Sequence, residues 1–322
     1  MTDSASAVER AQPSPAAMTS LVLGVASLLL PVVAGVPAML LGYRTLYAIN
    51  ASDGRQSGRR LAIAGMVLGS LTTVAGIAGF IILIFVNLSQ RSRVVECENN
   101  LRRLGLALNV YHDTTAEKTF PPAAIPNPNL AIGDRLSWHT AILPYLDQEH
   151  ATGKKWQRLS EQIDRKRAWH DAANAEAANT TLAVLLCPNH PTYDPAARPA
   201  PTHFVGISGV GADAAERPRG DRRAGFFGYE RVLRRLPRDL PAGISHTLMV
   251  LETASDNGPW IAAGFPTARG VPDGERLIGQ GAPFGGCHSG GMNALYVDGS
   301  VRFESDKIEP RILRDLARLE RD

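Results

Sequence analysis

The fold of this chain is decided by LAIAGMVLGSLTTVAGIAGFIILIFVNL (61–88) and the segment that follows it directly, SQRSRVVECENNLRRLGLALNVYH (89–112). The first segment has no charged residue over 28 positions. A helix needs about 20 apolar residues to cross the ~30 Å hydrocarbon core, so this segment predicts a transmembrane helix. No proline separates the two segments. Together they predict one long helix over residues 61–112 that starts in the membrane and becomes the spine of a soluble domain.

The second segment has the pattern of an amphipathic helix that packs on a core. Its apolar residues are spaced 3, 4, 3, 4 and 3 positions apart, which places them on one helix face: Val94, Cys97, Leu101, Leu104, Leu108 and Tyr111. Glu96 and Arg103 fall on other faces. We therefore expect Cys97 to face the core of the soluble domain.

A second apolar segment, Met18–Tyr43, precedes the spine and is uncharged over 26 residues. It predicts another transmembrane helix, kinked by its prolines at Pro31 and Pro37. A secretory signal peptide is the alternative, which the length of the apolar segment disfavours. Residues 1–17 are small and polar and predict a disordered tail. Residues 18–88 are thus expected to form a two-helix transmembrane anchor.

Small residues recur in the second predicted span, at Gly65, Gly69, Gly76 and Gly79. Such residues let another helix backbone approach closely in a membrane. We expect them to pack against the first span, and a homodimer seam is the alternative. Two spans would place the tail and the large domain on the same side of the bilayer. Four arginines then lie in the loop between the spans and five flank them on the other side, so charge does not decide the orientation.

The overall charge argues against nucleic acid as a partner. The formal net charge is +3, and 34 basic residues are mixed with 31 acidic ones along the chain. A nucleic-acid-binding surface would gather basic residues in one patch. The partner that the composition does predict is the lipid bilayer.

Residues 89–322 predict an α+β domain. The clearest local signal is a β-hairpin, in which two β-like runs flank Asp298-Gly299, a pair suited to the positive φ angles of a tight turn. Gly-rich residues 265–291 are expected to be loop. The other expected elements are a short helix from Ser137, strands at 182–186, 204–207 and 247–251, and a C-terminal amphipathic helix from about Glu309.

Several short motifs, in order along the chain, together resemble one family. They are CENNLRRLGLALNVYH (97–112), FPP (120–122), LSW (136–138), LPYL (143–146), LCP (186–188), GISHT (243–247), Glu252, and His288 followed after nine residues by Asp298-Gly299. This set resembles the prepilin-like bacterial family filed as domain of unknown function 1559. The resemblance implies a pilin-like long helix packed on an antiparallel β-sheet. Residues 18–88 separately resemble the two-helix domain of unknown function 4190.

One family feature is absent from the residues. Prepilins begin with a short basic leader and a peptidase site of Gly-Phe-Thr type followed by a glutamate, and both predicted spans lack acidic residues. A fixed anchor, rather than a cleaved and polymerised subunit, is therefore expected. The resemblance places the protein in the bacterial inner membrane, with several passes and the large C-terminal domain on the extracytoplasmic side.

The family pattern also pairs two of the three cysteines. The cysteine before Asn-Asn-Leu and the one before Pro, here Cys97 and Cys187, recur together, which implies a disulfide and an oxidising compartment. The alternative is a pair of buried thiols. Cys287 is then the odd cysteine and is expected to be a free thiol.

No catalytic, cofactor-binding or metal site is predicted from the residues. His288 and Asp298 would lie at opposite ends of a strand about 20 Å long if the residues between them are extended. The neighbours Cys287 and His288 should point to opposite faces of an extended chain. We therefore expect a non-enzymatic envelope protein that acts in secretion or surface assembly, through envelope protein partners or self-association.

Two other functions stay open. Trp260 and the Gly-rich residues 265–291 could line a cleft of a module that binds a solute or carbohydrate. A hydrolase is the third hypothesis, and it would need His, Asp and Ser side chains from distant segments to meet.

Overall fold

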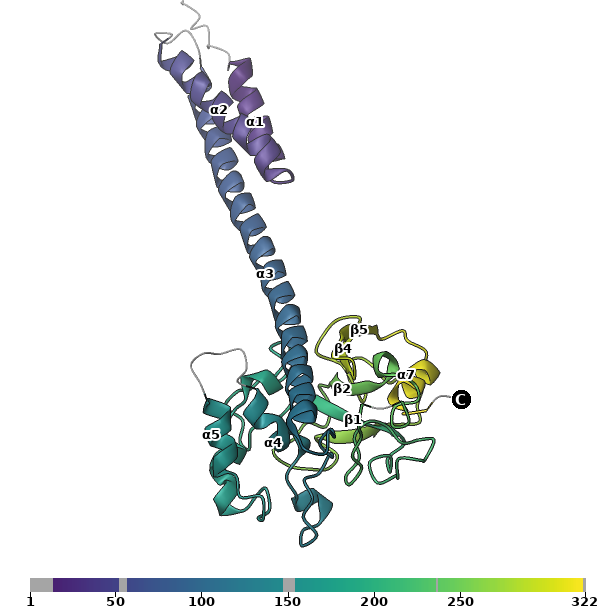
Figure 1. Cartoon of the computed structure of the whole chain (residues 1–322). Coiled ribbons are helices and arrows are strands. Elements are labelled where there is room, and N and C mark those ends of the chain that lie inside the picture. The colour runs from purple at the N-terminus through teal and green to yellow at the C-terminus, as the bar shows by residue number, and fades with distance from the viewer. Residues whose placement is uncertain (1–13, 52–56, 147–153, 236, 321–322) are drawn as a thin grey trace, which may run out of the picture. The chain divides into compact units, whose positions relative to one another are not determined.

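The computed structural model describes residues 14–51, 57–146, 154–235 and 237–320 (Figure 1). They divide into two compact units: a helical unit that ends at Ser89 and an α+β unit that begins at Gln90. The longest element, α3 (Arg59–Thr114), is one helix of 56 residues. Its first part belongs to the helical unit and its last part to the α+β unit, so the two units are described in turn.

The helical unit begins with two helices where the sequence predicted one span. α1 (Pro15–Ala26) ends before Ser27, and α2 (Pro31–Asn50) starts four residues later. The expectation of a single helix over Met18–Tyr43 is therefore wrong. The physical reason is Pro31, which has no N–H to continue a helix and is suited to the first turn of a new one. The tail prediction also changes, since residues 15–17 are helical and residues 1–13 lie outside the described part.

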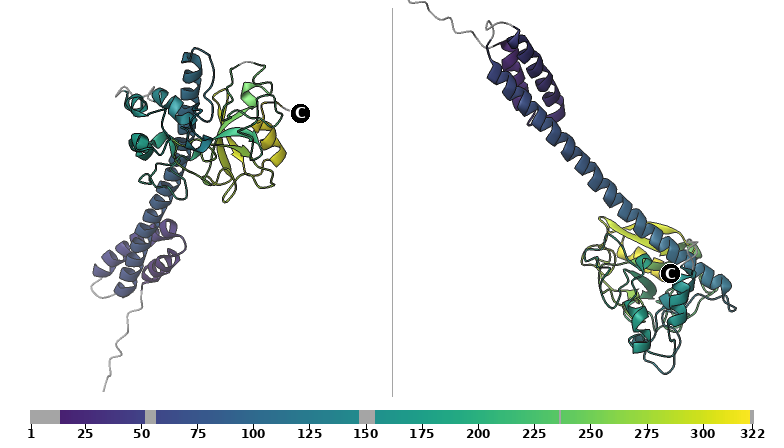
Figure 2. Two further views of the ribbon diagram at one scale, coloured as in Figure 1. Left: turned by 90° about the horizontal axis from the view of Figure 1, so that it is seen from below. Right: turned by 90° about the vertical axis from the view of Figure 1, so that its left-hand side faces the viewer.

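α1 and α2 form a hairpin that packs along α3. The Ser14 N–H donates to the Ser57 carbonyl at 3.1 Å, so α1 begins beside the start of α3. At the other end, the Ser27 and Thr72 hydroxyls are 2.6 Å apart, and the Thr73 hydroxyl donates to the Pro31 carbonyl at 3.1 Å. α1 therefore runs parallel to α3 and α2 runs antiparallel to it (Figure 2).

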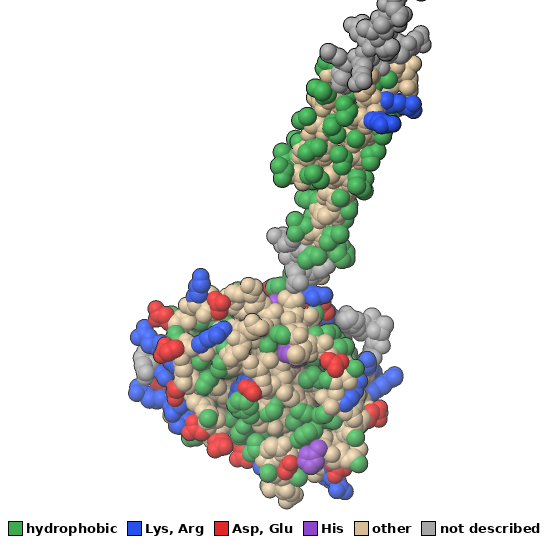
Figure 3. Space-filling model, turned by 180° about the vertical axis from the view of Figure 1, so that it is seen from behind, with side chains coloured by type: hydrophobic (Ala, Val, Ile, Leu, Met, Phe, Trp, Pro, Cys, Tyr) green, Lys and Arg blue, Asp and Glu red, His purple; other side chains and the backbone are tan. Residues whose placement is uncertain are grey.

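Among the described residues of this unit, two helical segments are long and apolar enough to cross a membrane, Pro31–Asn50 and Arg59–Val86. Large apolar side chains of both segments are exposed, and hydrophobic side chains dominate the face of the unit drawn in Figure 3. A water-exposed apolar surface of this kind is typical of an interaction site or a membrane segment.

Gly65 tests the packing of the hairpin. A Cβ atom at Gly65 would lie 2.5 Å from the backbone of Ser20, whereas one at Gly79 would meet nothing within 4 Å. Gly65→Leu is expected to destabilise the hairpin contact by about 1–3 kcal/mol, the usual cost of overpacking. The measurement is disulfide cross-linking of Ser27→Cys to Thr72→Cys in membranes, which Gly65→Leu should strongly reduce. Gly79→Leu is the matched control, and an equal loss in both variants would contradict the packing.

The α+β unit contains a five-stranded sheet with strand order β3-β1-β2-β4-β5. The strands are β1 (Phe204–Val210), β2 (Leu248–Glu252), β3 (Ala268–Val271), β4 (Gly291–Tyr296) and β5 (Val301–Ser305). Most neighbours are antiparallel, but β3 pairs with β1 in parallel. The sheet is therefore mixed, and the expectation of a purely antiparallel sheet is wrong. After β2 the chain crosses to the far side of β1, which places β3 parallel to that strand.

Helices cover both faces of this sheet (Figure 1). The last part of α3 lies on one face, where Leu101, Leu104 and Leu108 share a core with Val250 and Leu295. The helix approaches closely because Gly105 has no side chain: a Cβ there would lie 2.8 Å from Leu295. α7 (Pro310–Ala317) covers the other face through a second core. The predicted spine stripe, including the inward Cys97, is confirmed.

Other elements differ in detail from the sequence expectations. The predicted strand 182–186 is a short 3-10 helix, Ala183–Leu185, and β3 lies inside the predicted loop 265–291. The helix expected from Ser137 is α4 (Trp138–Ile142), whose N-cap is Ser137, continued by the 3-10 turn Leu143–Tyr145. The remaining helices are α5 (Lys155–Gln162) and α6 (Ala175–Asn179), and short 3-10 turns lie at Ile132–Asp134, Ala172–Asn174 and Ile244–His246.

Candidate functional site

All three cysteines of the chain meet in one buried cluster. Cys97 on α3 and Cys187 form a disulfide that closes a sequence separation of 90 residues. Cys287 is a buried free thiol. Its Sγ, the Cys187 Sγ and a Glu252 carboxylate oxygen lie within 4.8 Å of one another. The predicted pairing of Cys97 with Cys187 is thus present, although Cys187 follows a 3-10 turn and not the strand that the sequence suggested.

His288 lies in the same cluster and pairs with Glu252, the last residue of β2. The His288 Nε2 is 3.0 Å from Glu252 Oε1 and 3.5 Å from the Cys187 Sγ. The side chains of His288 and Glu252 are 2% and 0% exposed, so their contact is shielded from water. The backbone N–H and side-chain amide of Asn293 donate to Glu252 Oε2 at 3.1 and 2.8 Å. Glu252 Oε1 makes no aligned hydrogen bond within the described part of the chain, despite its short distance to His288.

The sequence expectation for Cys287 and His288 is wrong in its geometry. Both side chains reach the same pair, Cys187 and Glu252, instead of pointing to opposite faces. The chain around them is not extended, because Gly285, Gly286 and Gly290 have φ angles of 72°, 88° and 81°. Glycine adopts such angles without strain, and it turns the backbone so that neighbouring side chains converge.

Two further histidines lie beside the disulfide. The Cys187 N–H donates to His203 Nδ1 at 3.0 Å, and the His203 ring stacks on His190 with centroids 3.8 Å apart. The His190 Nε2 in turn lies 2.7 Å from the Asn257 amide nitrogen. Burial lowers the pKa of His203 to about 3. His203 is therefore a neutral acceptor that fixes the backbone at Cys187.

The lowered pKa of His203 predicts a pH-dependent stability. The unfolded chain has a histidine pKa of about 6.5 and binds a proton that the folded chain does not bind. The stabilisation from neutral His203 is complete above pH 6.5 and falls as the pH drops towards 3. His203→Gln keeps an acceptor for the Cys187 N–H but cannot titrate. We expect it to flatten the dependence of the unfolding free energy on pH by about 1.4 kcal/mol per pH unit between pH 4 and 6.

The comparison variant is His203→Ala, measured by denaturant unfolding across the same pH range. It should flatten the slope equally, and it should also cost stability near pH 8 because the Cys187 N–H loses its acceptor. A slope in His203→Gln that equals the native slope would contradict a buried neutral His203.

The cluster borders a surface pocket of about 710 Å³. Cys287 and His288 line it together with Arg276, Asp306 and Lys307. Burial, followed by the nearby Glu252 carboxylate, raises the pKa of the Cys287 thiol. The thiol is therefore protonated at neutral pH, which makes it a poor nucleophile on its own.

Asp298 and Gly299, the other half of the predicted signature, lie in the β4–β5 turn. The Ser300 N–H and hydroxyl donate to Asp298 Oδ1 at 2.9 and 2.6 Å. Gly299 has a φ of 83°, while Asp298 is not among the described residues with positive φ. The β-hairpin is confirmed. Its turn differs from the expectation in one respect, because Gly299 has a positive φ angle and Asp298 does not. Asp298 thus stabilises a turn that follows β4, whereas His288 precedes that strand.

The aromatic side chain proposed for a ligand cleft lies in the core. Trp260 is fully buried, and its indole N–H donates to the Thr180 carbonyl at 3.0 Å. It has no free face on which a sugar or solute could stack. The Gly-rich segment does border the pocket beside Cys287, so only that part of the prediction finds a cavity.

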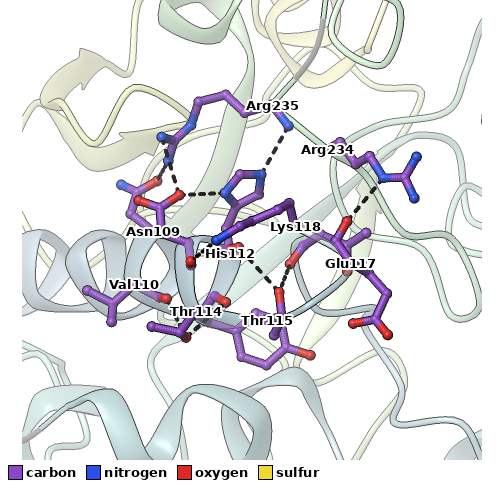
Figure 4. Close-up of polar contacts among 12 residues, drawn as sticks. Asn109, Val110, His112, Thr114, Thr115, Glu117, Lys118, Arg234 and Arg235 are labelled. Atoms are coloured by element: carbon purple, nitrogen blue, oxygen red, sulfur yellow. Dashed lines mark hydrogen bonds and ion pairs between the residues drawn. The ribbon is translucent and has the colours of Figure 1, made fainter.

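A separate polar network holds the C-terminal end of α3 (Figure 4). The Arg235 N–H donates to His112 Nε2 at 3.3 Å, and His112 Nδ1 lies 2.7 Å from the Asp113 carboxylate. The Arg235 guanidinium donates to the Asn109 side chain. The hydrogen bond from His112 lowers the pKa of Asp113. These contacts dock residues 234–235 on the end of the helix, which gives His112 a structural role.

The sequence analysis named Glu252 as one motif of the family resemblance but gave it no place in a site. It missed Asn293, His203 and Asn189, whose amide nitrogen lies 3.2 Å from His288 Nδ1. These three are polar residues whose positions become informative only when distant segments are brought together.

The fold and the site together define a class: an α+β domain that is disulfide-bonded to a long helix whose first part could span a membrane. The chain belongs to the family described as Protein of unknown function (DUF1559), which matches residues 90–272. The match ends before His288 and Asp298, and it does not include residues 18–88. No curated protein and no solved structure matches the chain.

Proposed function

We propose that this protein is a non-enzymatic, membrane-anchored envelope protein that carries a pilin-like domain outside the cytoplasm. It would act in secretion or surface assembly, through other envelope proteins or through copies of itself. The observation that carries the proposal is helix α3. Residues 61–88 of this helix are uncharged and apolar, and its last part supplies the core stripe of the α+β unit. A helix with both properties suits a domain tied firmly to a bilayer.

The disulfide supports an extracytoplasmic domain. Disulfides form and persist in oxidising compartments, and the cytoplasm keeps most thiols reduced. The Cys97–Cys187 bond ties α3 to the segment after the 3-10 turn Ala183–Leu185. A structural role there is consistent with an envelope location.

The α1–α2 hairpin supports a membrane topology that differs from the one expected from the sequence. The hydrogen bond between Ser14 and Ser57 keeps the start of α1 beside the start of α3. The second half of α2 lies there too, since a Cβ at Gly42 would be 2.9 Å from the Ala62 carbonyl of α3. The turn at Ser27 lies opposite Thr72, which is about 20 Å along α3 at 1.5 Å per residue. Because α1 enters the membrane and α2 returns to the side where α1 began, the hairpin makes no net crossing. Only α3 then carries the chain from the side of the N-terminal tail to the side of the large domain. The tail is then cytoplasmic and the domain extracytoplasmic, instead of both lying on one side.

Paired reporter fusions at the two ends test this topology. Alkaline phosphatase fused after Asp322 should be active, because it folds only outside the cytoplasm, and a fluorescent protein fused before Met1 should be fluorescent on the cytoplasmic side. The protein should also stay in the membrane pellet after alkaline carbonate extraction. A phosphatase fusion that is inactive after Asp322, or a protein that alkali releases, would overturn the proposal.

A further inference from the structure

The free thiol of the chain lies next to its disulfide in the buried cluster. The Sγ atoms of Cys287 and Cys187 lie within 4.8 Å of each other, and a carboxylate oxygen of Glu252 lies within the same distance of both. The Cys97 Sγ is bonded to Cys187 and lies within 4.8 Å of a ring nitrogen of His288. Cys187 is therefore the sulfur that both groups share. An attacking thiol, a central sulfur and a leaving sulfur are what thiol–disulfide exchange requires.

The loop that carries Cys287 has the freedom to bring its thiol onto Cys187. Gly285 and Gly286 precede the cysteine and have φ angles of 72° and 88°. Glycine has the widest choice of backbone angles of any residue. The two sulfur atoms start within 4.8 Å of each other and must approach to the S–S bond length of about 2.05 Å. A change of the Cys287 rotamer, with small changes at the glycines, moves the sulfur over distances of this order.

Glu252 and His288 are placed to carry the proton that the exchange moves. Burial raises the pKa of the Cys287 thiol, so its attack depends on a neighbouring base. Glu252 lies beside that thiol, and its Oε1 is 3.0 Å from His288 Nε2. The Asn189 side-chain nitrogen lies 3.2 Å from His288 Nδ1 and can donate to it, which leaves the ring proton on Nε2. The pair thus connects the thiol that loses a proton with Cys97, which gains one.

We propose that Cys287 exchanges with the disulfide and moves the covalent link of Cys187 from α3 to the loop before β4. The Cys287 Sγ forms a bond to the Cys187 Sγ while the bond between Cys187 and Cys97 breaks. The proton of Cys287 passes to Glu252. His288 gives its Nε2 proton to the Cys97 sulfur and takes the proton from Glu252. One thiol and one disulfide stand on each side of the reaction, so no outside oxidant or reductant is needed.

The exchange changes how the long helix is held. In the resting form, Cys97 ties α3 covalently to the segment after the 3-10 turn Ala183–Leu185. In the exchanged form, the apolar stripe of α3 stays on the sheet by packing alone. The step opens this covalent lock without reduction, so it can take place in an oxidising compartment. It depends on the disulfide and not on the membrane topology, so each can fail without the other.

Thiol mapping of the native protein tests the exchange without any substitution. Full-length protein in detergent is incubated at pH 7 or at pH 9, where more of the thiol is ionised, and is then quenched in acid, denatured, alkylated without reduction and digested. At pH 7 the label should lie on Cys287. At pH 9 it should appear on Cys97 in the amount that Cys287 loses, together with peptides joined through Cys187 and Cys287. A label that stays on Cys287 alone at pH 9 would overturn the proposal.

Two cysteine variants test the order of the sulfur atoms. Each is purified under reductant, freed of it, and treated with oxidised glutathione, which reaches Cys287 through the surface pocket. Cys97→Ser should form a disulfide between Cys187 and Cys287 and release two molecules of reduced glutathione. Cys187→Ser keeps Cys97 and Cys287, which belong to different groups of the native cluster, and should retain glutathione on Cys287. Equal formation of an internal disulfide in the two variants would contradict attack at Cys187.

Glu252→Gln tests the proton path. The glutamine carbonyl can still accept the two hydrogen bonds from Asn293, but the side chain is no longer a base. The appearance of label on Cys97 should slow by about 100-fold or more, as expected for the loss of a general base. The final division of label between Cys97 and Cys287 should not change, whereas a purely structural effect would shift it. His170→Ala, at an exposed histidine, is the control and should keep the native rate. A native rate in Glu252→Gln would contradict the proton path.

Discussion

Cys97→Ser is expected to lower the free energy of unfolding of the α+β unit by about 4–5 kcal/mol. The native bond closes a loop with a sequence separation of 90 residues, and a loop of this length loses that much chain entropy in the unfolded state on the polymer model. The measurement is denaturant unfolding of the detergent-solubilised protein. The unfolded fraction at each denaturant concentration is read from the proteolysis of the α+β unit. Cys187→Ser should give the same loss, and the double variant should add little to it, because all three proteins lack the same bond.

The free cysteine supplies the control for this prediction. Cys287→Ala removes one buried sulfur atom without opening a loop, so only a small packing loss is expected. If Cys97→Ser and Cys287→Ala unfold at the same denaturant concentration, the disulfide does not constrain the domain.

His288→Ala is expected to cost about 3–5 kcal/mol, because it removes the side chain that faces Glu252 Oε1 in a part of the domain shielded from water. The two side chains are almost completely buried and 3.0 Å apart. The measurement is the same unfolding experiment on the oxidised protein. A double variant, His288→Leu with Glu252→Leu, should recover much of the loss, since an uncharged pair of similar volume needs no desolvation of charge.

Asp298→Ala is the comparison within the same signature. Asp298 accepts hydrogen bonds from Ser300 at an exposed turn, so its loss should cost only about 1 kcal/mol. A loss in Asp298→Ala as large as that in His288→Ala would contradict the separate roles of the two residues. Recovery of stability in the double variant of His288→Leu and Glu252→Leu would identify the buried charge as the cause of the loss in His288→Ala.

The spine and the β-hairpin could be predicted from the sequence because their patterns are local. Leu101, Leu104 and Leu108 share a helix face whatever the rest of the chain does. Asp298-Gly299 forms a turn between two strands, and this turn depends only on residues that are close together in the sequence. The hairpin of α1 and α2 was missed because its apolar residues run on from one helix to the other. The break at Ser27–Leu30 depends on Pro31 and on packing against Thr72 and Thr73.

The site could not be predicted because it depends on strand pairing. Glu252 and Asn293 meet only because β2 pairs with β4. His288 reaches them through a loop whose glycines have positive φ, which the rule of alternating faces does not cover. The parallel position of β3 has the same origin, since a crossover sets it and no local pattern does. Local periodicity thus predicts elements, and distant pairings decide which polar side chains converge.

Thiol trapping in living cells tests the central claim that α3 is locked by a disulfide to an extracytoplasmic domain. Cells are quenched in acid, and the denatured protein is treated with a maleimide that adds a fixed mass to every free thiol. We predict that one of the three cysteines reacts, that it is Cys287, and that all three react after reduction. Three reactive cysteines before reduction would contradict both the disulfide and the location outside the cytoplasm.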